Sequence, residues 1–317
     1  MKVLLFTHKN DIDGMGNVVL AKLAFSGEVD YELCGTFDLT KAIERYFEDN
    51  TIYNYDYIYV TDLCLEDPIL TKVAEDKKLQ GKVLVYDHHK TFIDPKYTQH
   101  KFITVQIGNE HGLCCGTSLF YQHLINKKLL DINSKAIKQF VELTRQHDTW
   151  EWKNIYNNET ARELAILFDV VGCEEYINLM TNKLANNNQE DFEFSLLEKT
   201  LIRNRLAQIE DKLKYYAENI FYQEILEMKA GIVFIDYEYR NELAEYLREN
   251  KFNMDFVMMV SLERGVVSYR SIKDGIHVRE VAELFGGKGH EKAASNPIND
   301  QMKNIILDAL TNPKNTQ

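Results

Sequence analysis

The chain has 317 residues, of which 37 are basic and 49 acidic, so its formal net charge at pH 7 is −12. Hydrophobic residues make up 45% and charged residues 27% of the chain, which is typical of a globular protein and excludes a disordered one. The acidic balance argues against a binder of long duplex nucleic acid, because such proteins carry a broad basic face. A small nucleotide ligand, or a metal site that neutralises clustered aspartates, is compatible with this charge.

Neither a membrane protein nor a disulfide-stabilised secreted protein is indicated. No apolar run approaches the ~20 residues that span a bilayer, and the apolar stretch at 3–6 is far too short for a signal peptide. The five cysteines are odd in number and form no CxxC pair, which favours reduced thiols and a cytoplasmic location. We interpret Cys114 and Cys115 as small packed side chains rather than a redox pair.

Short apolar runs alternate with helical patterns in the first part of the chain. Strands buried on both faces, as in a parallel sheet, are predicted where apolar residues follow one another, at 2–6, 57–60 and 82–86. Helices are predicted between them, at 14–25, 39–47 and 68–77. This alternation predicts an α/β fold with a doubly wound parallel sheet, which binds ligands at the carboxyl ends of its strands. Each of these strand ends leads into Asp or His.

Helical patterns continue at 116–127 and 134–146, and the polar run 186–189 interrupts them. Apolar residues then recur at spacings of four and three between 202 and 220. This stripe predicts a connecting helix, with a coiled-coil dimer seam as the alternative.

A second unit follows the connecting helix. Its strands are predicted at 231–235, 256–262 and 266–271, and its helices at 241–249 and 278–285. The sequence therefore predicts a larger α/β domain at 1–185, a helical linker at 186–225 and a smaller α/β domain at 226–317.

Carboxylates and imidazoles gather at the ends of the predicted strands. The first strand-to-helix turn holds His8, Asp11 and Asp13, and two later strands lead into Asp62 and Asp87-His88-His89. Each Asp taken alone has an ordinary explanation as a helix N-cap, because its carboxylate accepts the free N–H groups of the next turn. Carboxylates that converge at one sheet edge would repel one another, and divalent cations would relieve that repulsion.

The ligand types indicate which ions would fit. Asp and His without Cys favour a hard or borderline ion such as Mn²⁺ or Mg²⁺ over structural zinc. More ligands are present than one ion needs, which suggests a two-metal site. Two metals ~3.5–4 Å apart typically bridge a hydroxide and clamp a phosphoryl group for in-line displacement. The chemistry indicated is phosphoester hydrolysis.

Four motifs in this order resemble those of the DHH phosphoesterase superfamily: His8…Asp11-x-Asp13-Gly14, Asp62, Asp87-His88-His89 and Asp148. The segment Gly286-Gly287-Lys288-Gly289-His290 resembles the glycine-rich signature of the accessory DHHA1 domain. Together the resemblances cover nearly the whole chain and imply the oligoribonuclease (nanoRNase) branch rather than family II pyrophosphatases. The implied activity is hydrolysis of short oligoribonucleotides to mononucleotides with two divalent cations, Mn²⁺ first and Mg²⁺ or Co²⁺ as alternatives.

The resemblance also implies a role for each motif residue. One metal would be held by His8, Asp11 and Asp62. The other would be held by Asp13, Asp62, His88 and Asp148, so that Asp62 bridges the two. His89 would face the scissile phosphate, and Asp87 would orient the histidines beside it. His147 is an alternative ligand next to Asp148.

The smaller domain is expected to bind the rest of the nucleotide. Glycines let backbone N–H groups approach a phosphate or a base closely, and the planar fork of arginine suits phosphate. The family analogy makes five residues candidate substrate contacts: Arg270, Ser271, Gly287, Gly289 and His290. A substrate cleft between two domains that close on the nucleotide is expected from this layout.

Several alternatives stay open. The segment that begins at His111 and Gly112 is interpreted as a turn before a helix N-cap, with a substrate contact as the alternative. The rival enzymes are a 3′-phosphoadenosine-5′-phosphate phosphatase and a cyclic mono- or dinucleotide phosphodiesterase. A non-catalytic nucleotide- or RNA-binding module is the rival from a different class. The expected partner is a short oligonucleotide or small nucleotide, without long duplex nucleic acid or membrane, and a homodimer is left open.

Overall fold

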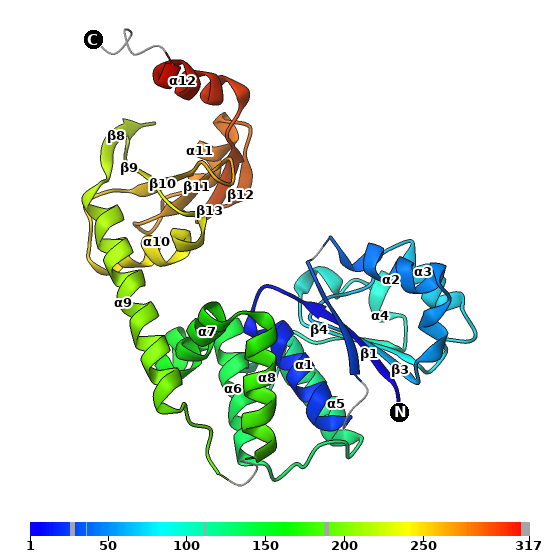
Figure 1. Cartoon of the computed structure of the whole chain (residues 1–317). Coiled ribbons are helices and arrows are strands. Elements are labelled where there is room, and N and C mark those ends of the chain that lie inside the picture. The colour runs from blue at the N-terminus through cyan, green and yellow to red at the C-terminus, as the bar shows by residue number, and fades with distance from the viewer. Residues whose placement is uncertain (26–28, 36, 111, 187–189, 312–317) are drawn as a thin grey trace. The chain divides into compact units, whose positions relative to one another are not determined.

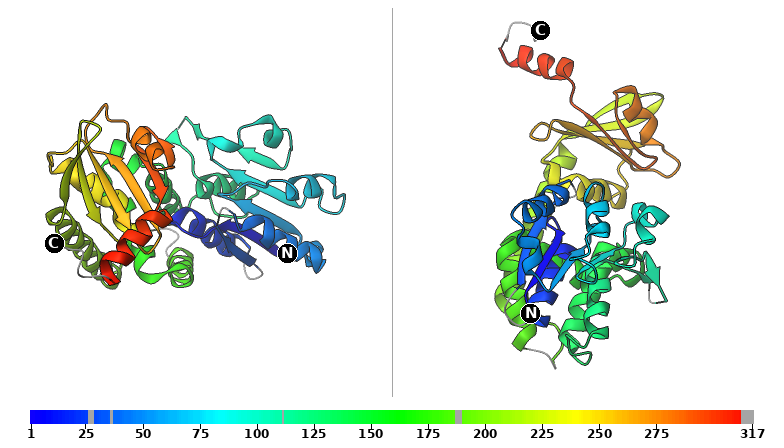
Figure 2. Two further views of the ribbon diagram at one scale, coloured as in Figure 1. Left: turned by 90° about the horizontal axis from the view of Figure 1, so that it is seen from above. Right: turned by 90° about the vertical axis from the view of Figure 1, so that its right-hand side faces the viewer.

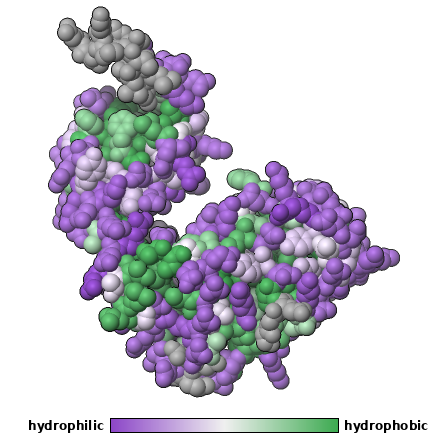
Figure 3. Space-filling model, viewed as in Figure 1, coloured by the Kyte–Doolittle hydropathy of each residue, from purple (hydrophilic) through white to green (hydrophobic). Residues whose placement is uncertain are grey.

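The computed structural model describes residues 1–25, 29–35, 37–110, 112–186 and 190–311. The chain forms two compact units, Met1–Arg203 (unit 1) and Asn204–Gln317 (unit 2), which divide within helix α9 (Leu196–Glu218) (Figure 1). Residues 187–189, in the polar run expected to interrupt the helices, lie outside the described part. On the face shown in Figure 3, hydrophilic residues make up most of the surface of each unit.

Unit 1 is built on a five-stranded parallel sheet in the order β2-β1-β3-β4-β5. Its strands are β1 (Val3–His8), β2 (Val29–Cys34), β3 (Tyr57–Thr61), β4 (Val83–Asp87) and β5 (Ile103–Val105). The three strands predicted from apolar runs are confirmed, and they are the three inner ones. The two edge strands were not predicted, because β2 mixes polar and apolar residues and β5 has only three residues.

Helices cover both faces of this sheet, as the prediction of a doubly wound fold requires (Figure 1). On one face lie α2 (Leu39–Glu48), α3 (Ile69–Glu75) and α4 (Pro95–Thr98), packed over a core that includes Phe6 and Val60. On the other lie α1 (Ile12–Ala24), α5 (Gly116–Asn126) and α6 (Lys135–Asp148), joined by α7 (Glu159–Val171) and α8 (Cys173–Asn186). The predicted helices in this unit are confirmed. One correction concerns α6, which reaches Asp148, so this residue ends a helix instead of following one.

Short elements fill the connections of unit 1. The 3₁₀ turns are η1 (Thr51–Asn54) and η2 (Lys90–Phe92), η3 (Trp152–Tyr156) is a π-helix, and β6 (Gly108–Asn109) pairs with β7 (Gly112–Leu113).

Register within the sheet decides where the functional residues lie. Thr7 is paired with Thr61, and Thr61 with Tyr86, across three adjacent parallel strands. The next residues along these strands are His8, Asp62 and Asp87, so all three reach the carboxyl edge at the same level.

Unit 2 contains a six-stranded mixed sheet in the order β12-β13-β11-β10-β9-β8. The strands are β8 (Phe221–Ile225), β9 (Met228–Phe234), β10 (Phe256–Ser261), β11 (Val266–Ser271), β12 (Lys288–His290) and β13 (Ala293–Pro297). Around them lie α10 (Arg240–Glu249), α11 (Val278–Leu284), α12 (Asp300–Thr311) and the 3₁₀ turn η4 (Tyr237–Tyr239). Helices α10 and α11 lie on opposite faces of the sheet (Figures 1 and 2). The predicted strands and helices are confirmed, and β8, β12, β13 and α12 were missed.

The predicted connecting helix is α9, and four residues of its apolar stripe are buried: Ile202, Ile209, Leu213 and Tyr216. Among the described residues, no helix combines the length and the apolar character that crossing a membrane would need. All five cysteines are free, and Cys34, Cys64, Cys114 and Cys115 are buried, which agrees with the interpretation of Cys114 and Cys115 as packed side chains.

A buried ion pair fixes the end of α6. Arg145 donates to Glu151 Oε2 over 2.5 Å and to the carbonyl oxygen of Leu113 over 2.9 Å. Glu151 in turn accepts the N–H of Leu113 over 3.1 Å. The side chains of Arg145 and Glu151 are 8% and 6% exposed, so water screens them little. This network holds strand β7 against the last turn of α6, which carries Asp148.

We predict that Glu151→Gln lowers the free energy of unfolding of unit 1 by about 2–3 kcal/mol, because it leaves the buried Arg145 charge without one partner. Urea unfolding followed by tryptophan fluorescence measures this, since both tryptophans, Trp150 and Trp152, lie in unit 1. The control is Glu159→Gln, which removes one side of an exposed pair with Arg162 and costs less than about 1 kcal/mol. An equal loss of unfolding free energy in Glu151→Gln and Glu159→Gln would contradict the stabilising role of the network.

Candidate metal centre

The turn between β1 and α1 places three donor side chains. His8 ends β1, and its Nδ1 lies 2.6 Å from Asp11 Oδ2. Asp11 is the N-cap of α1, because its other oxygen accepts the Gly14 N–H over 3.0 Å. The N-cap explanation is therefore correct for Asp11, and it leaves Oδ2 directed at the site. Only glycine fits at position 14, since a Cβ there would lie 1.8 Å from the His8 carbonyl oxygen.

Asp13 is fully buried and is fixed by a helix far away in the sequence. The N–H groups of Gly116 and Thr117, at the start of α5, each donate to its carboxylate over 2.7 Å. A Cβ at Gly116 would lie 2.6 Å from Asp62 Cβ, so glycine is required there as well. This contact was not predicted from the sequence, where the Gly-Thr pair at a helix start was its only signal.

The N-cap predicted before α5 is confirmed, whereas Gly112–Leu113, interpreted as part of a turn, form strand β7. Cys115 is the N-cap residue, and it forms a reciprocal capping box with Ser118. His111, the residue with which this segment begins, lies outside the described residues.

The two other strand ends supply the rest of the site. Asp62 follows β3 in a left-handed conformation with φ 56°, is 3% exposed and donates its N–H to the Tyr86 carbonyl oxygen. Asp87 ends β4 and is fully buried. Its Oδ1 accepts the N–H groups of His88 and His89 and lies 2.7 Å from His89 Nδ1. Its buried Oδ2 has no hydrogen-bond partner among the described atoms.

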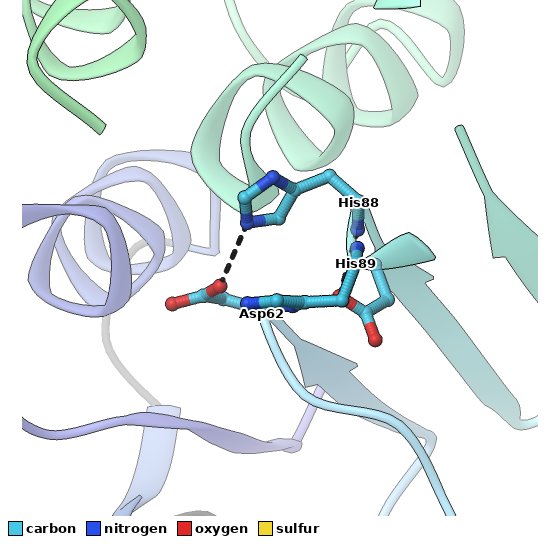
Figure 4. A group of neighbouring side chains, drawn as sticks. Asp62, His88 and His89 are labelled. Carbon is cyan, nitrogen blue, oxygen red and sulfur yellow. Dashed lines mark hydrogen bonds and ion pairs between the residues drawn. The ribbon is translucent and has the colours of Figure 1, made fainter. Parts of the chain in front are cut away.

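These residues form overlapping groups of donors whose atoms lie within 4.8 Å of one another. The groups are His8, Asp11 and Asp62; Asp13, His88 and Asp148; and Asp62, Asp87, His88 and His89. His88 joins the first two groups, because its Nε2 is 3.2 Å from Asp62 Oδ1 (Figure 4). Its Nδ1 is 3.7 Å from Asp148 Oδ2. His147 belongs to none of these groups.

The donor set fits divalent cations. Among the described residues it consists of carboxylates and imidazoles without a thiolate, and none of them donates a hydrogen bond to the buried Asp87 Oδ2. Hard and borderline cations prefer such ligands.

Comparison with known proteins gives the family. No protein-family model matches the chain. Oligoribonuclease NrnB of Bacillus subtilis (strain 168) is 31% identical over 305 residues, which are 96% of this chain and 74% of that protein. The chain belongs to the DHH/DHHA1 phosphoesterase family.

Two solved structures show the same fold as this DHH/DHHA1 chain. One is a pGpG-specific phosphodiesterase, PggH, from Vibrio cholerae, with 12% identity, a TM-score of 0.57 and coverage of 98% of this chain and 97% of that one. The other is the DHH domain of a member of a family of ribosomal proteins, with 13% identity, a TM-score of 0.60 and coverage of 98% and 86%.

The candidate substrate contacts in unit 2 do not all lie on one face of its sheet. Arg270 and His290 are both cross-strand partners of Ala293, so they lie at one level on the same face of the sheet. Ser271 follows Arg270 on β11 and therefore points to the opposite face, where it is 3% exposed. The structure thus places Arg270 and His290 on one face of the sheet, with β13 between their strands, and Ser271 on the other face.

The two glycines of unit 2 that were candidate substrate contacts lie against neighbouring backbone. A Cβ at Gly287 would lie 2.4 Å from the Ser295 carbonyl oxygen, and one at Gly289 would lie 2.4 Å from Ala294 Cα. Close packing on β13 is sufficient to explain why both positions are glycine.

The carboxylates of the metal centre in unit 1 repel one another, and burial shifts the pKa values of several residues there. Burial raises the pKa of Asp62 well above its usual range, and the carboxylates of Asp13 and Asp11 raise it further. Burial, with the same two neighbours, raises the pKa of Asp148 to about 9. Burial lowers the pKa of His88 and lowers that of His147 to about 4. Without cations, burial therefore favours protonated Asp62 and Asp148 and neutral His88 and His147. Two neighbours go the other way: burial of Asp11 is outweighed by its contacts with His8 and the Gly14 N–H, which together lower its pKa, and the hydrogen bond to Asp87 raises the pKa of His89.

We predict that the metal-free protein loses stability as the pH rises above 7. Folded Asp148 keeps a proton up to about pH 9, whereas the unfolded residue releases it near pH ~4. The contribution of Asp148 to stability is complete below the pKa of the unfolded residue, and it is lost as the pH rises toward the pKa of the folded residue. Asp148 alone should cost unit 1 about 1 kcal/mol of unfolding free energy between about pH 7 and pH 8. Asp62 and His89, whose pKa values are also raised in the folded protein, change the stability in the same direction.

Urea unfolding in EDTA, followed by tryptophan fluorescence, measures this slope. Asp148→Asn should make it shallower by about 1 kcal/mol per pH unit, because the neutral amide replaces the protonated carboxyl group. A slope that Asp148→Asn leaves unchanged would show that this carboxyl group is ionised in the metal-free protein.

Proposed function

We propose that this DHH/DHHA1 chain is a phosphodiesterase that hydrolyses short oligoribonucleotides to mononucleotides with two divalent cations. The observation that carries the proposal is the set of overlapping donor groups at one sheet edge, in which Asp62 and His88 each belong to two groups. The similarity to oligoribonuclease NrnB supports the choice of substrate. The shared fold of a pGpG-specific phosphodiesterase agrees with it.

The donor groups suggest how the cations would be held. One would lie among His8, Asp11 and Asp62, and the other among Asp13, His88 and Asp148, with Asp62 shared between them. The ligand types favour Mn²⁺, with Mg²⁺ or Co²⁺ as alternatives. When bound, such ions lower the pKa of a water molecule and neutralise charge on a phosphoryl group.

The protein would orient the scissile phosphate through His89. Asp87 Oδ1 lies 2.7 Å from His89 Nδ1 and so fixes the ring, which is 52% exposed. The hydrogen bond to Asp87 also raises the pKa of His89, which favours the protonated ring, and a protonated ring can donate its Nε2–H to a phosphate oxygen while Nδ1–H donates to Asp87. Asp87 acts through this histidine as a positioning residue.

Unit 2 would supply cationic contacts to the substrate. Arg270 donates to Asn241 Oδ1 over 2.9 Å, which directs its guanidinium toward the start of α10. Arg240, at that start, stacks on Tyr237 with its guanidinium 3.9 Å from the ring centroid. Burial lowers the pKa of Arg270, and the nearby Arg240 lowers it further. A phosphate bound between these arginines would relieve their repulsion.

The cytoplasmic location is part of the same proposal. It is supported by the five free cysteines, since a disulfide framework is the usual mark of an oxidising compartment.

We predict that Asp62→Ala lowers Mn²⁺-dependent hydrolysis of a dinucleotide at least ~10³-fold, because both cations lose a ligand. Tryptophan fluorescence and circular dichroism should show that the variant is folded. A panel of a dinucleotide, a pentanucleotide, a cyclic dinucleotide and 3′-phosphoadenosine-5′-phosphate identifies the substrate. Retained dinucleotide cleavage by Asp62→Ala would contradict the proposed site, and no cleavage of the linear substrates by the wild type would contradict the proposed function.

We predict that His290→Ala raises KM for the dinucleotide about tenfold and leaves kcat within about twofold, because the contact is made equally in the bound and transition states. His277→Ala is the matched control, since His277 is another exposed histidine of unit 2. A collapsed kcat with unchanged KM in His290→Ala would show that this residue acts in the chemical step instead.

A further inference from the structure

A pocket of about 340 Å³ lies directly beside the metal centre in unit 1. One side of it is formed by donor residues of the centre, among them Asp62, His89 and Asp148. The other side comes from the start of α2 and from the segments that follow β3 and β4, and it includes Leu39, Leu63 and Phe92. A ligand whose phosphate lies at the metal centre would therefore place its neighbouring group in this pocket.

The lining of the pocket beyond the metal centre includes apolar side chains that the core supports. Leu39 and Leu63 are 4% and 6% exposed and belong to the core between the sheet and α2. Phe92 packs on this core and meets Tyr97 edge to face, with ring centroids 5.0 Å apart. A metal centre by itself has no need of an apolar wall. Preformed apolar walls beside a few polar groups are the mark of a small-molecule site.

The polar groups of this pocket limit what can enter it. Glu66, Thr40 and Thr91 line it beside the apolar wall, and no Lys or Arg is among the described residues that do so. A second phosphate is disfavoured next to the Glu66 carboxylate. A flat, uncharged group with N–H donors fits both the apolar wall and the carboxylate.

We propose that this pocket binds a guanine base of the substrate against Phe92, with Glu66 accepting hydrogen bonds from its edge. The inference deepens the proposed function and rests on it, because it places the adjoining phosphate at the metal centre. Guanine offers two parallel N–H donors, N1–H and N2–H, which a carboxylate can accept together. Uracil offers one N–H between two carbonyl oxygens, which the carboxylate repels. Stacking on the aromatic ring is tolerant of the base, so Glu66 supplies the selectivity.

The test compares ligands with and without a base on the Mn²⁺-loaded full chain. Calorimetry measures the Kd of guanosine 5′-monophosphate, uridine 5′-monophosphate and ribose 5-phosphate. Phe92→Ala should raise the Kd of guanosine 5′-monophosphate about tenfold and leave the Kd of ribose 5-phosphate within about twofold of the wild-type value. Ile93→Ala is the matched control, because Ile93 is the exposed neighbour and does not line the pocket. Phe92→Leu, which keeps an apolar side chain but removes the ring, should give the same pattern if Phe92→Ala unfolds.

Glu66→Gln tests the recognition of the base. The wild type should prefer guanosine over uridine 5′-monophosphate about tenfold, and Glu66→Gln should reduce that ratio to about two or less. Two results would overturn the inference. One is an equal loss of affinity for the nucleotides and for ribose 5-phosphate in Phe92→Ala. The other is a preference for guanosine over uridine 5′-monophosphate that Glu66→Gln leaves unchanged. Dinucleotide hydrolysis by the wild type is measured in parallel. Its absence would refute the proposed function, whereas these binding ratios report on the pocket alone.

Discussion

Electrostatic repulsion among carboxylates at the edge of a parallel sheet is the constraint on which the rest of unit 1 depends. Register brings the ends of β1, β3 and β4 to one level, and Asp62 and Asp87 are buried there with Asp13 beside them. Burial and the neighbouring carboxylates both raise the pKa of Asp62. Cations placed among these groups would satisfy the same donors that now oppose one another.

The surroundings of the centre hold these charges in place. The first N–H groups of α5 fix Asp13, Asp87 fixes His89, and the Arg145–Glu151 pair fixes the helix end that carries Asp148. Each of these supports comes from a different part of the chain, so the folding of unit 1 and the geometry of the site are coupled. Oriented supports of this kind are what keep metal ligands ready to bind.

The sequence predicted what strong local patterns encode. Continuous apolar runs marked the inner strands, and the Asp and His residues after them marked the metal centre, because parallel strands must end at a common edge. Contacts set by distant packing could not be predicted: the hydrogen bond from the Gly116 N–H to Asp13, and the wall formed by Phe92. The alternation of side chains along β11 separates Arg270 from Ser271, yet the family analogy had grouped the two residues.

The most direct test of the account is a crystal structure of the Mn²⁺-soaked protein with an anomalous difference map at the manganese edge. The account predicts two anomalous peaks at the carboxyl edge of the unit 1 sheet. One peak would lie among His8, Asp11 and Asp62, and the other among Asp13, Asp62, His88 and Asp148. A single peak, or peaks that Asp62 does not share, would contradict the two-metal centre on which the proposed hydrolysis depends.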